Sequence, residues 1–210
     1  MSRIDAVLFD YGMVLSGPPD RRARVRMESL LRTTPERFDD AYWRSRDAYD
    51  RGSLSAAAYW KAVADDLGLP LDATTLAALI AADNEHWTQP NEPMIAWAHA
   101  LRAAGVSTGI LSNIGDAMEE GVRARFPWLD EFTHCTFSHR LGIAKPDTAI
   151  YLHAARGLGV APEQILFIDD RAENVAAARS VGMAAIQYSD HEAFLAELQA
   201  EWRAEGLDLL

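Results

Sequence analysis

The sequence predicts an α/β fold in which helices cover both faces of a parallel sheet and a small α-helical cap is inserted after the first strand. The first indication is that short apolar runs alternate with amphipathic helical stretches. The second is that residues 16–90 break this alternation, because they are almost wholly helix-compatible. The third is that polar residues directly follow several predicted strands, where ligands bind in open α/β sheets. These features predict a sheet with a site at its carboxyl edge.

Five segments have the composition of buried strands: 4–9, 106–111, 132–137, 164–168 and 184–188. Between and after the later strands, the pattern predicts helices over 93–104, 146–157 and 171–181, and a last helix from His191 to Trp202. Pro146 is expected in the first turn of the second of these helices. The spacing Ser189-x-x-Glu192 predicts a capping box at the start of the last one.

Residues 16–90 are predicted to form the cap, and residues 1–15 and 91–210 the α/β core. Pro35, Gly52, Gly68-Leu69-Pro70 and Gln89-Pro90 divide the cap into about four helices. Its two connections to the core would be 17–19 and 89–93. We expect a lid that closes over the site and excludes water, and the alternative is a helical layer packed rigidly on the sheet.

The composition narrows the class of protein. A chain of 210 residues with 49% hydrophobic and 24% charged residues is typical of a globular protein with a sizeable core. A net charge of −11 argues against a nucleic-acid partner, although a local cation would still allow small anionic substrates. A single cysteine, Cys135, and the lack of a signal pattern or membrane-length apolar run predict a cytoplasmic protein with no membrane partner. The sequence carries no signal for an oligomeric state.

Asp10 follows the first predicted strand directly, in Asp10-Tyr11-Gly12. A carboxylate at this position is well placed for chemistry, and Gly12 would let the backbone turn sharply or approach a ligand. Taken alone, Asp10 is more simply an acidic residue that ends a strand. Its interpretation depends on the residues that follow the other strands.

Ser112, Asn113 and Lys145 are candidates for binding a phosphate. A hydroxyl, an amide and the N–H groups of a helix start together favour an anion, although Ser112 or Asn113 would also serve as a helix cap. Lys145 precedes Pro146, which favours an extended lysine backbone and holds the ammonium at the mouth of a helix. Such a cation offsets the charge of crowded carboxylates and of a phosphate, whereas an isolated lysine is usually solvated.

Asp169 and Asp170 end the fourth predicted strand, and Asn174 follows one helical turn later. Adjacent carboxylates repel each other unless a cation compensates them, and oxygen ligands suit Mg²⁺. The alternative is that Asp170-x-x-Glu173 is a capping box, which leaves Asp169 unexplained.

These four motifs, in this order, resemble those of the haloacid dehalogenase-like hydrolase superfamily, and the resemblance covers nearly the whole chain. The chain is similar to members with a Rossmann-like core and a helical cap between the first and second motifs. Among these it most resembles small bacterial sugar phosphatases and the phosphatase domain of soluble epoxide hydrolase. The motifs are Phe9-Asp10-Tyr11-Gly12-Met13-Val14-Leu15, Leu111-Ser112-Asn113, Lys145-Pro146-Asp147, and Phe167-Ile168-Asp169-Asp170 with Asn174.

The resemblance implies a Mg²⁺-dependent phosphatase that acts on a small phosphorylated metabolite. Asp10 would be the nucleophile that takes the phosphoryl group as an aspartyl phosphate. Ser112, the Asn113 backbone and Lys145 would bind the phosphate, with Ser112 and Lys145 also counted as catalytic. The implied metal residues are Asp10, the Gly12 carbonyl and Asp170, with Asp169 beside them.

Gly12 departs from the family pattern, because related phosphatases usually carry a second Asp there as general acid and base. Such help is worth roughly two to four decades in rate, so slow hydrolysis is expected unless another group substitutes. One alternative is a 2-haloacid dehalogenase with Arg44 or Arg46 as a carboxylate clamp, but members with that activity generally lack the acidic pair. Another alternative is a phosphometabolite-binding protein with little turnover. The retained Asp10 and Lys145 argue against it, because a protein that only binds has no use for an exposed nucleophile.

The cap residues do not identify the substrate. Five aromatic residues lie at helical spacing and could line a pocket, but residues of this kind more often form a core, and that role is predicted here. They are Tyr42, Trp43, Tyr49, Tyr59 and Trp60. Four arginines are predicted to form a solvated helix face in preference to a basic patch; they are Arg21, Arg22, Arg24 and Arg26.

Overall fold

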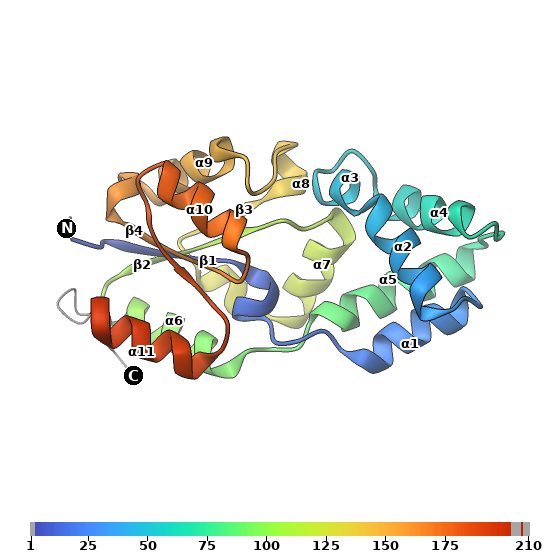
Figure 1. Ribbon diagram of the computed structural model, residues 1–210, viewed down its shortest axis with the longest axis horizontal. Helices are drawn as coiled ribbons and strands as arrows, with labels where there is room; N and C mark the ends of the chain where they lie inside the picture. The colour runs from blue at the N-terminus through green and yellow to red at the C-terminus, as the bar shows by residue number, and fades with distance from the viewer. Residues whose placement is uncertain (1–2, 203–206, 208–210) are drawn as a thin grey trace.

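The computed structural model describes residues 3–202 and residue 207, so both ends of the predicted core lie outside the described residues. Within the described part, five parallel strands form one sheet in the order β3-β2-β1-β4-β5 (Figure 1). The strands are β1 (Ala6–Phe9), β2 (Ser107–Ser112), β3 (His134–Phe137), β4 (Ile165–Asp169) and β5 (Ala184–Gln187). Each overlaps a predicted strand, and the predicted fold class is confirmed.

Strand β1 lies in the centre of the sheet and pairs with β2 on one side and β4 on the other. Its four residues are all buried, as expected for a parallel strand with helices on both faces. Asp10, the next residue, therefore emerges at the middle of the carboxyl edge. The ends of β2 and β4 flank it, and these ends carry Ser112 and Asp169.

Helices cover both faces of the sheet. The face that carries Val7 and Phe9 packs against α6 (Glu92–Ala103), α7 (Asp116–Arg125) and α11 (His191–Glu201). The face that carries Ala6 and Leu8 packs against α9 (Thr148–Leu158) and α10 (Ala172–Ser180). Each fully buried Leu, Ile or Phe contributes about 1.5–3 kcal/mol of transfer free energy, so these two layers stabilise the sheet beneath the site. No helix among the described residues is long and apolar enough to cross a lipid bilayer.

One predicted helix start is wrong by two residues, and one predicted N-cap is wrong by one residue. α9 begins at Thr148, after Pro146, and its N-cap is Asp147, whose carboxylate accepts from the Ala149 N–H. The N-cap of α11 is Asp190 and not Ser189, because Asp190 accepts from the N–H of Ala193. In both cases an Asp near the predicted start satisfies the free N–H groups of the first turn.

Five helices form the cap, which stands beside the sheet on the side of its carboxyl edge (Figure 1). They are α1 (Arg21–Leu30), α2 (Pro35–Arg44), α3 (Arg46–Asp50), α4 (Ala56–Asp66) and α5 (Ala73–Trp87). The prediction was about four helices, and it did not separate α2 from α3 because the short break at Ser45 carries no Pro or Gly. The boundaries at 15/16 and 90/91 stay a prediction.

The cap has its own apolar core, so most of the aromatic residues play the structural role that was predicted. Tyr42, Tyr49, Tyr59 and Trp60 are buried in it, and the rings of Tyr49 and Tyr59 stack 4.7 Å apart. Trp43 differs, because 54% of it is exposed. Two of the four α1 arginines form ion pairs within the cap: Arg24 with Glu28 and Asp39, and Arg26 with Glu85.

Besides the packing of α5 against α7, the cap contacts the core at two separate places. Ser16 and Pro90 form an antiparallel bridge where the chain enters and leaves the cap. Further away, Tyr49 packs closely over Gly115, and the Ala56 N–H donates to the Asp116 carboxylate at 3.0 Å. This second contact places α3 directly over the loop that follows β2.

Glu119 of α7 holds the core side of this second contact together. Its carboxylate accepts from Arg123 and Arg140 at 2.6–2.7 Å and lies 2.7 Å from the His139 ring nitrogen. Arg140 and His139 belong to α8 (Ser138–Leu141), the helix that contacts α3. Burial alone would raise the pKa of Glu119, but the hydrogen bonds from these groups lower it below its usual value.

We therefore expect Glu119→Gln to destabilise the fold by about 1–3 kcal/mol at neutral pH. The pKa of Glu119 is lower in the folded protein than in the unfolded chain, where it is about 4.3. The carboxylate therefore stabilises the fold at pH values above about 4.3, and this stabilisation is lost as the pH falls through the pKa of the folded protein. Urea unfolding at pH 7 and at about pH 3 measures both effects. The difference between the two proteins is expected to shrink at the lower pH, and a constant difference would contradict the ionic origin.

Candidate active site

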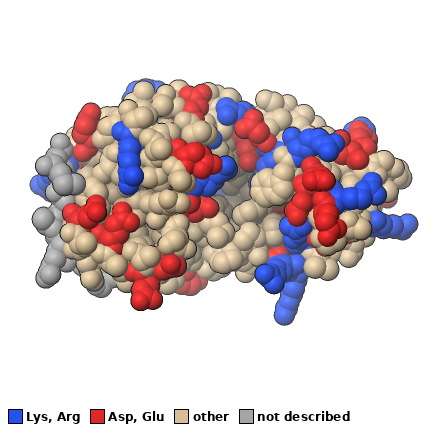
Figure 2. Space-filling model, viewed as in Figure 1, with Lys and Arg blue, Asp and Glu red and all other residues tan. Residues whose placement is uncertain are grey.

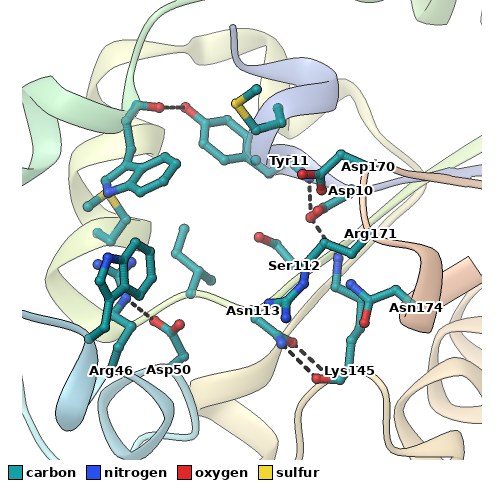
Figure 3. A pocket seen from close by; sticks show the side chains of 16 residues that line it. Asp10, Tyr11, Arg46, Asp50, Ser112, Asn113, Lys145, Asp170, Arg171 and Asn174 are labelled. Carbon is teal, nitrogen blue, oxygen red and sulfur yellow. Dashed lines mark hydrogen bonds and ion pairs between the residues drawn. The ribbon is translucent and has the colours of Figure 1, made fainter. Parts of the chain in front are cut away.

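A pocket lies between the carboxyl edge of the sheet and the cap, with a volume of about 240 Å³ (Figure 3). The space-filling view shows the molecule hollowed between its two parts, with acidic and basic side chains mixed over this face (Figure 2). The pocket lining includes six of the seven predicted site residues, namely Asp10, Gly12, Ser112, Asn113, Lys145 and Asp170. The seventh, Asp169, is fully buried beside them.

Asp10 is buried and held by two donors. Its Oδ1 accepts from the Tyr11 N–H at 2.7 Å and lies 2.7 Å from the Lys145 ammonium. Burial raises the pKa of Asp10 to about 7, and the negative charges of Asp169 and Asp170 add to the rise while Lys145 opposes it. The carboxylate is therefore fixed in place in a crowded anionic site.

The loop after Asp10 differs from expectation at Gly12. Its backbone is ordinary and extended, with φ −64° and ψ 130°, and the left-handed residue is Met13 at φ 60°. The turn is closed by the Ser16 hydroxyl, which accepts from the Met13 N–H at 3.2 Å. A Cβ built at Gly12 would meet nothing within 4 Å. The fold therefore does not require glycine here, and the space beside it opens into the pocket.

Lys145 joins two of the carboxylates. Its ammonium lies 2.7 Å from Asp10 and 2.7 Å from Asp169, and its side chain is almost completely buried. Burial alone would lower the pKa of Lys145, but the two carboxylates raise it, so the ammonium keeps its charge. The solvated-lysine alternative does not fit this position.

Asp169 is saturated with hydrogen-bond donors, whereas Asp170 faces the pocket. The Asp169 oxygens accept from Lys145, from the Arg171 N–H at 2.9 Å and from the Asn174 amide at 2.9 and 3.1 Å. The capping-box alternative for Asp170 is wrong, because α10 begins at Ala172 with Arg171 at its N-cap position. Burial and the charge of Asp169 raise the pKa of Asp170.

Ser112 and Asn113 do not cap the following helix, whose N-cap position is Gly115. The Asn113 side chain instead holds the Lys145 backbone: its Nδ2 donates to the carbonyl at 2.9 Å, and its Oδ1 accepts from the N–H at 2.8 Å (Figure 3). Asn113 thereby fixes the loop that presents the ammonium. The Ser112 side chain lines the pocket.

The carboxylates of the site fit a hard divalent cation. Oxygens of Asp10, Asp169 and Asp170 lie within 4.8 Å of one another, and Lys145 is the cation that contacts them among the described residues. One ammonium leaves this cluster with excess negative charge. Oxygen-only ligands and a crowded anionic site are what Mg²⁺ prefers.

The cap contributes residues that the sequence analysis did not assign to this site. Asp50 and Trp87 line the pocket, together with Trp43 and Arg46. Figure 3 shows Arg46 and Asp50 on one side and Asp10 and Asp170 on the other. Arg44, the other arginine considered as a clamp, pairs with Asp66 and does not line the pocket. No pattern distinguished Asp50 in the sequence, since its position depends on how α3 docks onto the core.

Comparisons with known proteins agree with this geometry. A family model described as haloacid dehalogenase-like hydrolase matches residues 24–182. Bifunctional epoxide hydrolase 2 of Sus scrofa is 34% identical over 57% of this chain, which spans only 22% of that relative. A sesquiterpene phosphatase of Aspergillus oryzae is 26% identical over 92% of this chain and 94% of its own length.

A solved structure shares the fold. An enzyme described as HAD family, from Bacteroides thetaiotaomicron, superposes with a TM-score of 0.77 at 20% identity, covering 90% of this chain and 95% of the other. The same enzyme in complex with magnesium and inorganic phosphate gives a TM-score of 0.72 at 20% identity, covering 91% of this chain and 98% of the other.

Proposed function

This chain belongs to the haloacid dehalogenase-like hydrolase family, and on that premise we propose that it is a Mg²⁺-dependent phosphatase of small phosphorylated metabolites. The observation that carries the proposal is the contact of Lys145 with Asp10 and Asp169, beside Asp170, in one pocket. A carboxylate attacks a phosphate only where positive charge offsets the repulsion between them. This site supplies one buried ammonium for that purpose, and its excess of carboxylates leaves room for a divalent cation.

In the proposed reaction, Asp10 attacks phosphorus and takes the phosphoryl group as an aspartyl phosphate. The Tyr11 N–H and the Lys145 ammonium both contact Oδ1 of Asp10, so they fix the direction of the carboxylate. Lys145, the Ser112 hydroxyl and the Asn113 backbone would bind the phosphoryl oxygens at the edge of the sheet. Water then hydrolyses the intermediate and restores Asp10.

Asp10, the Gly12 carbonyl and Asp170 would hold the Mg²⁺, with Asp169 hydrogen-bonded beside them. The oxygens of Asp169 already accept four hydrogen bonds, which suits a supporting position. When bound, the metal would neutralise charge on the transferring phosphoryl group.

The lining of the pocket indicates which phosphate esters fit. Its cap side combines the rings of Trp43 and Trp87 with the charged pair Arg46 and Asp50, and Met118 adds apolar surface from α7. We propose a compact ester whose alcohol part has apolar or aromatic surface. The pocket volume of about 240 Å³ suits an alcohol part of modest size.

Removal of Mg²⁺ tests the proposed function directly. We expect phosphate release from p-nitrophenyl phosphate to fall by at least roughly 100-fold when a chelator is added, and to return with excess Mg²⁺. Metal-independent release of phosphate would contradict the proposal. Chelator-insensitive chloride release from a 2-haloacid would instead favour a dehalogenase. Thermal stabilisation by phosphate esters without turnover would favour a binding protein.

A further inference from the structure

Gly12 leaves the proposed reaction without an obvious proton donor for the leaving group. Lys145 and the cluster of Asp10, Asp169 and Asp170 are already committed to the phosphoryl group and its charge. Tyr11 lines the pocket, but its hydroxyl donates to the Trp87 carbonyl, and burial raises its pKa above the usual value of a tyrosine. Among the described lining residues, the carboxyl group that remains outside the cluster is that of Asp50.

We propose that Asp50 of the cap is the general acid and base of this reaction, in place of the residue that Gly12 lacks. The inference rests on the proposed phosphatase function and adds a catalytic residue to it. It is carried by the position of Asp50 in the pocket, by its anchoring to the phosphate-binding loop and by the charges around it.

The backbone of Asp50 is tied to the core. The Ser138 hydroxyl donates to the Asp50 carbonyl, and the same oxygen accepts from the Ile114 N–H at 2.9 Å. Ile114 directly follows Asn113, so this link runs from α3 to the proposed phosphate-binding loop. The Asp50 carboxyl lies on the cap side of the pocket, across from Asp10 (Figure 3). A leaving group would lie between these two carboxyl groups.

The electrostatic surroundings of Asp50 allow it to gain and lose a proton. Arg46 Nε lies 2.9 Å from Asp50, while Arg46 Nη1 lies 3.8 Å from Asp83. One guanidinium thus faces two carboxylates, and Asp83 also accepts from the Tyr42 hydroxyl at 2.6 Å. When Asp50 is protonated, Asp83 still balances the charge of Arg46.

The other charged groups near Asp50 do not cancel this effect. Burial raises the pKa of Asp50, Arg46 opposes the rise, and Asp83 and Asp47 add to it. On the core side, the charged residues of α8 are turned to Glu119, which His139 and Arg140 contact. Asp50 therefore combines access to the pocket with a carboxyl group that holds a proton more readily than a solvated one.

Asp50 gives up one proton in the first half-reaction and regains one in the second. As Asp10 forms a bond to phosphorus, the bond from phosphorus to the leaving oxygen breaks, and that oxygen takes the proton of Asp50 to leave as an alcohol. Asp50, now a carboxylate, takes a proton from water while the water oxygen attacks phosphorus. The bond to Asp10 breaks, phosphate departs, and both side chains return to their starting states.

The test compares Asp50→Asn with the wild type on two esters of similar size, p-nitrophenyl phosphate and benzyl phosphate, with Mg²⁺ present. Nitrophenolate leaves without a proton, whereas benzyl alkoxide needs one. We expect kcat/KM to fall by roughly 10²–10⁴-fold for benzyl phosphate and by less than about 10-fold for the nitrophenyl ester. A burst of nitrophenolate is also expected, because the second half-reaction has lost its base.

A matched control and a rescue separate chemistry from structure. Asp65→Asn changes an exposed carboxylate of the cap that pairs with Lys61 outside the pocket, and it should leave both rates unchanged. Adding Gly12→Asp to Asp50→Asn should restore benzyl phosphate turnover, since a side chain at Gly12 has free space and an allowed backbone.

The outcomes are distinguishable. An equal loss on both esters, or no loss on either, would overturn the role of Asp50 and leave the phosphatase function standing. A wild-type protein that hydrolyses neither ester would overturn the phosphatase function itself, and the inference with it. Retained nitrophenyl kcat/KM in the variant shows that it is folded and supports a selective loss.

Discussion

Asp10→Asn is expected to lower Mg²⁺-dependent phosphate release by at least about 10⁴-fold, because a neutral amide oxygen is a far weaker nucleophile than a carboxylate. Asparagine keeps the shape of the side chain, and its Oδ1 can still accept from the Tyr11 N–H and the Lys145 ammonium, both 2.7 Å away in the wild type. The substitution also removes one charge from a cluster of three close carboxylates. The loss of activity should therefore occur without a loss of stability.

The measurement is steady-state phosphate release by the two proteins with Mg²⁺ present, beside a thermal melt of each. Asp5→Asn is a suitable control, because Asp5 lies just before the other end of β1 and pairs with Arg3 away from the pocket. We expect this control to retain wild-type activity. An Asp10→Asn protein that keeps a tenth or more of wild-type activity would exclude Asp10 as the nucleophile.

The fold and the core half of the site were predictable because both depend on local patterns. Apolar runs marked the strands, and in a parallel sheet their carboxyl ends meet at one edge. That rule alone brings Asp10, Ser112 and Asp170 together, although they are far apart in the chain. The motif order then identified the family from a single sequence.

The cap half of the site was not predictable, because it depends on docking between two separate apolar cores. No motif in the sequence marks Asp50, and it lines the pocket because α3 docks onto the core, where Tyr49 packs over Gly115 and the Ser138 hydroxyl donates to the Asp50 carbonyl. The exact position of the turn after Asp10 was not predictable either. Gly12 was expected to allow a sharp turn or a close approach to a ligand, but Met13 takes the left-handed conformation, and the Ser16 hydroxyl closes the turn around it.

Lys145→Met tests the electrostatic basis of the site by a second route, which requires no substrate. Methionine retains an apolar stem of similar length but leaves Asp10 and Asp169 buried without their common cation. Removing one partner of a buried ion pair costs about 3–5 kcal/mol, so the free energy of unfolding should fall by that amount. Phosphate release should fall by roughly 10²–10³-fold or more, because the ammonium would no longer stabilise charge on the phosphoryl group.

Urea unfolding in chelator and in millimolar Mg²⁺ distinguishes this explanation from a simple packing defect. Mg²⁺ that binds the folded protein adds stability by mass action, and it would neutralise the same carboxylates that Lys145 neutralises. Mg²⁺ should therefore recover part of the stability lost in Lys145→Met, whereas a packing defect would not respond to it. Lys61, exposed and paired with Asp65, provides the control, and Lys61→Met should leave stability and activity near wild type. A Lys145→Met protein as stable as the wild type in chelator would show that the carboxylates need no internal cation, and the charge argument for this site would be wrong.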